Sequence, residues 1–218
     1  MVLSRAESVD VSFERQDVDE STFLGVLADV RNALIDAGID HLFIGGVPSA
    51  VYGRARWSTD IDVLVRPEDR HRALEALERV GFATQETNPD WIFKATRNQV
   101  LVDVIFKSTG SIFLDEEMLQ RGQHREFRGV PLKVLAPEDL VILKVLAHDE
   151  PTSRHWFDAM AVITLADIDW DYFLQRARRS PRRMLSLLLY AQAEDITVPN
   201  AVINTLIDML SPEGVGVS

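Results

Sequence analysis

Apolar residues in the first third of the chain alternate between helical and strand-like spacing. A helix is predicted over residues 21–37, with Ser21 at its N-cap, because apolar side chains recur every three or four positions. Short apolar runs at 41–44 and 60–65 predict two strands. Proline at a helix first turn predicts a second helix over 67–80.

The middle of the chain has the pattern of two hairpins. Residues 91–95 and 100–106 are expected to pair as strands around a turn at 97–99. A short helix is expected within 111–123. Two further short strands, at 125–128 and 132–135, are predicted on either side of Gly129.

From Pro137 onward the spacing is helical throughout. Helices are predicted from Pro137 and over the segments 153–166, 169–179, 182–194 and 199–210. The predicted fold class is therefore α+β, a mixed β-sheet core with flanking helices over 21–136, followed by a C-terminal helical region over 137–212. Residues 1–20 carry no assignable pattern.

Composition narrows the class of protein. With 46% apolar and 26% charged residues, the chain has the mixture of a soluble globular protein, and the absence of cysteine excludes disulfides and thiolate metal sites. It has no apolar run long enough to cross a bilayer and no secretory signal pattern at its start, so a cytoplasmic location is expected. A net charge of −11 argues against coating nucleic acid non-specifically and leaves a local basic patch open.

Three aspartates interrupt apolar strands. Asp60 and Asp62 lie two apart in a predicted strand, so both point to one face, and Asp103 interrupts the apolar run 100–106. Like charges held this close need a cation or a shared proton, and Mg²⁺ prefers carboxylate oxygens, so these three residues are predicted metal ligands. The alternative is a solvated strand edge, with Asp103 as the ion-pair partner of Lys94 or Arg97.

A glycine pair follows the strand at 41–44. Gly45 and Gly46 precede a predicted helix start, a place where backbone N–H groups approach phosphate, and Ser49 adds a hydroxyl. The alternative is a tight turn that requires positive φ.

The order strand, Gly-Gly, helix and Asp-x-Asp, with thirteen residues between Gly46 and Asp60, resembles the DNA polymerase beta-like nucleotidyltransferase superfamily. The fuller string from Gly45 through Ser49, Arg56 and Asp62 is similar to the AbiEii/MenT-type toxin and minimal nucleotidyltransferase branches, and to small aminoglycoside nucleotidyltransferases. The resemblance implies a mixed-sheet nucleotidyltransferase core, Mg²⁺ and a nucleoside triphosphate donor. Asp103 matches the position of the third carboxylate.

A second segment carries a looser resemblance to AbiEii-like proteins. It runs from Pro137 to Lys144 and continues to Arg154 and Asp158. The resemblance implies that Lys144 and Asp158 bind nucleotide or take part in catalysis. The chain departs from the pattern at His155, where the family often has aspartate. The alternative for Lys144 is a lysine whose charged end reaches out from an apolar helix.

The resulting hypothesis is an Mg²⁺-dependent nucleotidyltransferase. Gly45, Gly46 and Ser49 would hold the triphosphate, and Arg56, Lys144 and Asp158 would complete the nucleotide site. Asp103 would bind a second metal ion or act as general base. The acceptor is RNA such as tRNA, a protein or a small molecule, and an antitoxin partner is possible if the chain is a toxin. The alternatives are an inactive binding module or an aminoglycoside-type enzyme.

Two groups outside these motifs complete the candidates. Five arginines are expected either to dock an RNA acceptor or to form a solvated corner between helices: Arg176, Arg178, Arg179, Arg182 and Arg183. Trp91 is expected in the core, whereas Trp57 is a candidate for stacking on a base.

Overall fold

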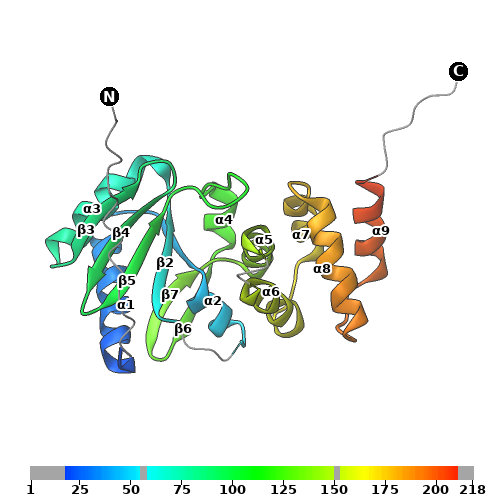
Figure 1. Cartoon of the computed structure of the whole chain (residues 1–218), viewed down its shortest axis with the longest axis horizontal. Coiled ribbons are helices and arrows are strands. Elements are labelled where there is room, and N and C mark those ends of the chain that lie inside the picture. The colour runs from blue at the N-terminus through cyan, green and yellow to red at the C-terminus, as the bar shows by residue number, and fades with distance from the viewer. Residues whose placement is uncertain (1–17, 55–57, 150–152, 211–218) are drawn as a thin grey trace, which may run out of the picture.

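A seven-stranded mixed sheet forms the first half of the protein in a computed structural model that describes residues 18–54, 58–149 and 153–210. The strand order is β3-β4-β5-β2-β1-β7-β6 (Figure 1). The strands are β1 (His41–Ile44), β2 (Asp60–Val65), β3 (Ala83–Asn88), β4 (Ile92–Arg97), β5 (Val100–Ile105), β6 (Gln123–Phe127) and β7 (Val130–Val134).

Helices pack on the sheet and then extend away from it. Helices α1 and α3 contact each other and the sheet, and α5 packs against α6, α7 and α8 in a helical stack that runs to α9 (Figure 1). The helices are α1 (Glu20–Asp36), α2 (Gly46–Val51), α3 (Arg70–Arg79), α4 (Glu116–Arg121), α5 (Pro137–Ala147), α6 (Arg154–Leu165), α7 (Trp170–Ala177), α8 (Pro181–Ala193) and α9 (Asn200–Asp208), and a 3₁₀ turn, η1 (Pro67–Asp69), precedes α3. The predicted α+β class is confirmed. The division into domains at 136 and 137 stays a prediction.

The strand pairing places the carboxylates. Strand β2 lies between β1, antiparallel to it, and β5, parallel to it, and Asp62 is the register partner of Asp103. The two antiparallel hairpins, β4–β5 and β6–β7, form as the sequence predicts. A parallel pair needs a long crossover, and the chain between β2 and β5 supplies it with α3, β3 and β4.

Two details differ from the sequence prediction. Helix α1 is capped by Asp19, whose Oδ1 accepts a hydrogen bond from the Thr22 N–H at 3.0 Å, and the Ser21 hydroxyl instead donates to Asp19 at 2.6 Å. Strand β3 was not predicted, because it is a polar edge strand whose side chains are exposed or half-buried and so lacks an apolar alternation.

A single apolar core joins the sheet to the helices on both sides of it. Its largest fully buried side chains include Phe23 on α1, Phe43 on β1, Phe93 on β4 and Phe173 on α7. No helix within the described residues is long and apolar enough to cross a membrane.

Candidate functional site

The three predicted aspartates lie on one face of neighbouring strands. Asp60 and Asp62 alternate with the fully buried Ile61 and Val63 along β2, and Asp103 lies beside Asp62 on β5. Neighbouring strands are about 4.8 Å apart, so the side chains of register partners on one face come within reach of each other. The structure therefore brings together the carboxylates that the sequence singled out.

Burial and neighbouring carboxylates disfavour the ionised forms of Asp62 and Asp103. Burial, and then the charges of Asp60 and Asp103, raise the pKa of Asp62 to about 7, although Lys144 and the Gly46 N–H oppose the shift. Burial likewise raises the pKa of Asp103, against the hydrogen bond and charge of Lys94. Asp62 therefore resists ionisation because it is buried and because it lies near two other carboxylates, and a divalent cation would offset both effects.

Lys94 occupies the place of a counter-ion. Its Nζ lies 2.6 Å from Asp103 Oδ1, as the alternative interpretation of Asp103 proposed, whereas Arg97 pairs with Asp29. As placed, no three His, Asp or Glu side chains of the described chain converge closely enough to hold a metal ion. The donor set still fits Mg²⁺, provided that Asp103 exchanges Lys94 for the ion. Metal ligation by Asp60, Asp62 and Asp103 therefore stays a proposal.

The Gly-Gly turn closes directly on Asp62. Gly45 has φ +74°, and a Cβ built on it would lie 1.8 Å from Asp62 Oδ2, so only glycine fits between β1 and this carboxylate. The next residue, Gly46, is the first residue of α2, and its N–H bonds to Asp62. The turn thus requires a positive φ and also lies at the cavity that holds the carboxylates.

Two serine hydroxyls form hydrogen bonds that hold the glycine turn and Asp60 in place. Ser49 is fully buried, and its hydroxyl donates to the Gly45 carbonyl at 2.8 Å, so it stabilises the turn and does not line the cavity. A role for Ser49 in triphosphate binding stays a prediction. Ser58, which the sequence analysis did not single out, donates to Asp60 Oδ1 at 3.0 Å and orients that carboxylate.

Lys144 and Asp158 form a buried ion pair next to the carboxylates. Lys144 Nζ lies 2.8 Å from Asp158 Oδ2, and the two side chains are 5% and 0% exposed. The other oxygen of Asp158 pairs with Arg54, which also donates to the Arg154 carbonyl at 2.8 Å. Asp158 therefore links the segment after α2 to helices α5 and α6, while Lys144 lines the cavity.

A cavity of about 320 Å³ lies over the carboxylates. The β-sheet wall contributes Gly45, Gly46, Asp60, Asp62 and Asp103, and the opposite wall comes from α5 and the start of α6. Trp91, expected in the core, instead lines this cavity with 44% of its surface exposed. The expectation failed because Trp91 stands just before β4, where its backbone carbonyl accepts from the Phe106 N–H while its ring is left outside the core.

The remaining candidates from the sequence are Arg56, Trp57 and the arginine cluster. Arg56 and Trp57 fall outside the described residues. In the arginine cluster, Arg176 is buried and pairs with Asp139 and Asp115, and Arg183 donates to the carbonyls of Val145, Leu146 and His148. These two arginines hold helices together, so the surface that could dock RNA is reduced to Arg178, Arg179 and Arg182.

Comparisons with known proteins agree with this geometry. A family model described as "uncharacterised nucleotidyltransferase" matches residues 7–196. A comparison with curated proteins finds no match. The fold is similar to that of the antibiotic-resistance factor ANT(2″)-Ia in its solution structure, at 16% identity and a TM-score of 0.57, covering 81% of this chain and 100% of that one.

Two further solved structures share the fold. ANT(2″)-Ia in complex with adenylyl-2″-tobramycin matches at 18% identity and a TM-score of 0.56, over 74% of this chain and 98% of that one. An antigenic nucleotidyltransferase-like protein from Paracoccidioides brasiliensis matches at 14% identity and a TM-score of 0.55, over 87% and 94%. At these identities the likeness confirms the nucleotidyltransferase-like fold.

Proposed function

Because this chain belongs to the family of uncharacterised nucleotidyltransferases, and is a nucleotidyltransferase enzyme, we propose that it transfers a nucleoside monophosphate from an Mg²⁺-bound nucleoside triphosphate to a hydroxyl group of a small-molecule acceptor. One observation carries this proposal. Asp62 lies between Asp60 and Asp103 on neighbouring strands and touches the Gly45-Gly46 turn. The carboxylates proposed to bind the metal ion and the glycine turn proposed to approach phosphate therefore line one cavity.

The chemistry follows from the residues of the cavity. The acceptor oxygen attacks the α-phosphorus, the bond from that phosphorus to the bridging oxygen breaks, and pyrophosphate leaves with the bonding electrons. The hydroxyl proton would pass to Asp103, whose Oδ1 would first give up its ion pair with Lys94. When bound, Mg²⁺ supplies positive charge that offsets the charge developing on the phosphates.

The basic side chains assist from the opposite wall. Lys144 lies in the cavity near Asp62, and Asp158 holds it there through a buried ion pair. Lys144 would stabilise the charge on the triphosphate, and Asp158 would position Lys144 without touching the nucleotide itself. The contribution of Arg56 stays a prediction from the sequence.

The cavity supports a small acceptor over a macromolecule. Its volume of about 320 Å³ suits a nucleotide with little more. Besides the three aspartates, its lining combines apolar residues such as Leu140 and Leu143 with the polar Ser108 and Thr109 and the basic Lys144 and Arg154. ANT(2″)-Ia, which shares the fold, was solved in complex with adenylyl-2″-tobramycin, a small molecule that carries an adenylyl group.

A labelling experiment tests the proposal. The protein is incubated with Mg²⁺ and each α-³²P-labelled nucleoside triphosphate, in parallel with total RNA, total protein, an aminoglycoside and a mixture of small metabolites. We expect label in the small-metabolite arm, lost in Asp62→Asn and kept in the exposed Asp90→Asn control. Label that survives Asp62→Asn would overturn the metal site, whereas label confined to RNA or protein would overturn the acceptor class.

The same experiment tests the resemblance to AbiEii/MenT-type toxins. Such a role predicts label in RNA or protein and growth arrest when the chain is expressed alone. RNA labelling would favour an acceptor such as tRNA, and relief of the arrest by a neighbouring gene product would identify an antitoxin partner. The remaining surface arginines, Arg178, Arg179 and Arg182, are the first residues to reverse in charge if RNA is labelled.

A further inference from the structure

A second cavity lies at the opposite end of β1 from the glycine turn, where it opens between β1 and β7. Its volume is about 200 Å³. Alternation along the strands places His41 on the face on which α1 packs, and His124 and Lys133 on the face of Leu42 and Ile44. No described residue lines both this cavity and the one that holds the aspartates, so the two are separate.

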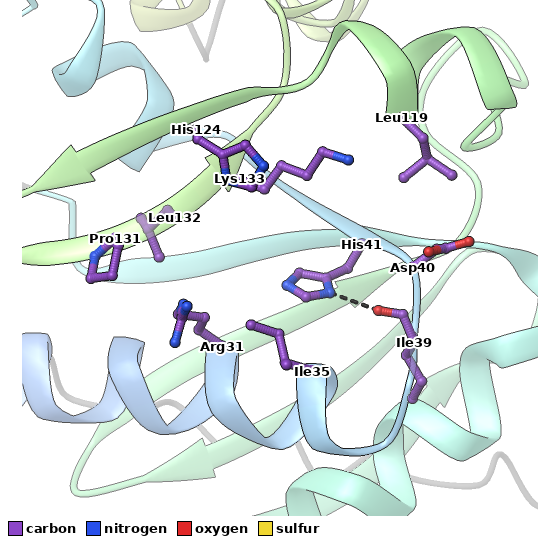
Figure 2. Close-up of a pocket in the computed structure, with 10 residues that line it drawn as sticks. All are labelled: Arg31, Ile35, Ile39, Asp40, His41, Leu119, His124, Pro131, Leu132 and Lys133. Carbon is purple, nitrogen blue, oxygen red and sulfur yellow. Dashed lines mark hydrogen bonds between the residues drawn. The ribbon is translucent and has the colours of Figure 1, made fainter.

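The cavity exists because β1 and β7 part from each other. Strands β1 and β7 pair in parallel at Phe43 and Val134. His41, two residues earlier on β1, lies beyond this paired position. The gap is closed from below by α1 and at one end by Leu119 of α4 (Figure 2). His41 therefore lines an open space where a continuous sheet would pair it with β7.

Basic groups collect around this space. Arg31 on α1, His41 on β1, His124 on β6 and Lys133 on β7 all line it, and Asp40 is the only carboxylate among its lining residues (Figure 2). This is unusual in a chain that carries 34 acidic and 23 basic residues. A local excess of positive charge in an acidic protein calls for a binding explanation.

These basic groups have no carboxylate of their own in the described part of the chain. Arg31 donates to Asn32 Oδ1 at 2.7 Å, and neither Arg31 nor Lys133 forms an ion pair there. Asp40 is shared with Arg66, whose Nε lies 3.7 Å from it. The positive charge at the cavity is therefore largely uncompensated by the protein.

His41 is the buried polar group of the cavity. Its Nδ1 lies 2.8 Å from the Ile39 carbonyl, and because a carbonyl only accepts, Nδ1 carries the proton. Nε2 has no hydrogen-bond partner among the described residues, and Figure 2 shows that side of the ring turned toward the part of the cavity where Arg31 and Leu132 lie. A ligand atom in the cavity would therefore meet an unused ring nitrogen on the side where Arg31 lies.

The remaining lining is apolar. Ile39, Leu119 and Leu132 are buried, whereas Ile35 leaves 49% of its surface exposed on the α1 side of the cavity. An exposed isoleucine beside uncompensated basic groups suits a molecule that has both an apolar part and a negative charge.

We propose that this cavity binds a small organic anion. Arg31, Lys133 and His41 would hold its carboxylate or phosphate, and Ile35 and Leu132 would contact its apolar part. Room equal to about seven water molecules limits the ligand to a compact one. The site is independent of nucleotide transfer at the carboxylate cavity.

The test is an NMR titration of the full chain observed at its histidine ring signals, of which it has five. The probes are phenyl phosphate, benzoate and the uncharged benzamide. We expect saturable shifts of the His41 and His124 signals with one or both anions and none with benzamide. Response to phenyl phosphate alone identifies a phosphate site, and response to benzoate alone a carboxylate site. Equal responses to all three probes, or no response to either anion, would overturn the proposal.

Variants separate this site from the catalytic one. Lys133→Gln should weaken binding of the responding anion at least tenfold, because a charge-assisted contact is lost. The matched control Arg125→Gln removes the same charge from the neighbouring strand at a residue that does not line the cavity, and should bind as the wild type does. Asp62→Asn should also bind normally. Equal loss in Lys133→Gln and Arg125→Gln would show a general charge effect and refute the site.

The pH at which the His41 ring takes up a proton gives a second test, measured on the same NMR signals with and without the anion. Burial, and then the charges of Lys133 and Arg31, lower the pKa of His41, whereas the Ile39 carbonyl and Asp40 oppose this shift; His124 also lines the cavity. A bound anion adds negative charge, so the His41 titration should move to higher pH in its presence. An unchanged His41 titration at saturating anion would contradict direct contact with this ring.

Discussion

Replacing Asp62 by asparagine should stabilise the protein in the absence of metal while removing its response to Mg²⁺. Burial, followed by the charges of Asp60 and Asp103, raises the pKa of Asp62 from 3.8 to about 7. Each unit is worth about 1.4 kcal/mol, so the ionised carboxylate costs the metal-free folded state up to about 4 kcal/mol at pH 8. Asparagine keeps the shape and an oxygen that accepts from the Gly46 N–H.

The sign of the pH dependence follows from the raised pKa. A group whose pKa is higher in the folded state favours folding fully below its unfolded value of 3.8, and this contribution is lost as the pH rises through about 7. The wild type should therefore lose stability between pH 4 and pH 7 relative to Asp62→Asn. Mg²⁺ should restore the stability of the wild type, because an ion that binds only the folded state stabilises it.

Urea unfolding followed by circular dichroism measures this difference, in chelator and in Mg²⁺, at pH 5 and pH 8. Asp90→Asn, at an exposed aspartate in the turn before β4, is the matched control and should follow the wild type in every condition. The reasoning is refuted if Asp62→Asn is less stable than the wild type at pH 8 without metal, or if Mg²⁺ stabilises both proteins equally.

Three further substitutions test the surroundings of Asp62. Gly45→Ala should cost at least about 2 kcal/mol in urea unfolding, because its φ is +74° and its Cβ would overlap Asp62; unchanged stability would contradict the close approach. Lys94→Met should tighten Mg²⁺ binding roughly tenfold in calorimetry by freeing Asp103, and weaker binding would show that Lys94 positions that carboxylate. Asp158→Ala should cost about 3–5 kcal/mol, because it removes a buried carboxylate shared by two cations, and a loss under 1 kcal/mol would argue against that bridge.

The sequence predicted the strands that carry the carboxylates well. Strands β2 and β5 have apolar runs that each contain an aspartate, and their neighbouring placement follows from the fold resemblance. The Lys94–Asp103 pair could also be predicted from the sequence. An antiparallel hairpin that pairs Arg97 with Val100 places Lys94 opposite Asp103. Local spacing therefore carried most of the information on this side of the site.

The other side of the site depends on contacts that no local pattern contains. Arg54 and Asp158 are 104 residues apart, and nothing near Arg54 indicates that it leaves solvent to pair with a buried carboxylate. The same applies to Arg176. The sequence groups it with four other arginines, but in the structure it pairs with Asp115, the N-cap of α4, and with Asp139 on α5. Tertiary packing decides which arginines are structural.

The most direct test of the three-carboxylate site is calorimetric titration of nucleoside triphosphate with and without Mg²⁺. The wild type should bind the nucleotide in Mg²⁺ and lose at least a hundredfold in affinity in chelator, and both Asp62→Asn and Asp103→Asn should bind no better in Mg²⁺ than the wild type does in chelator. Nucleotide binding that is equally tight without metal, or that survives both substitutions, would contradict a site built on Asp60, Asp62 and Asp103.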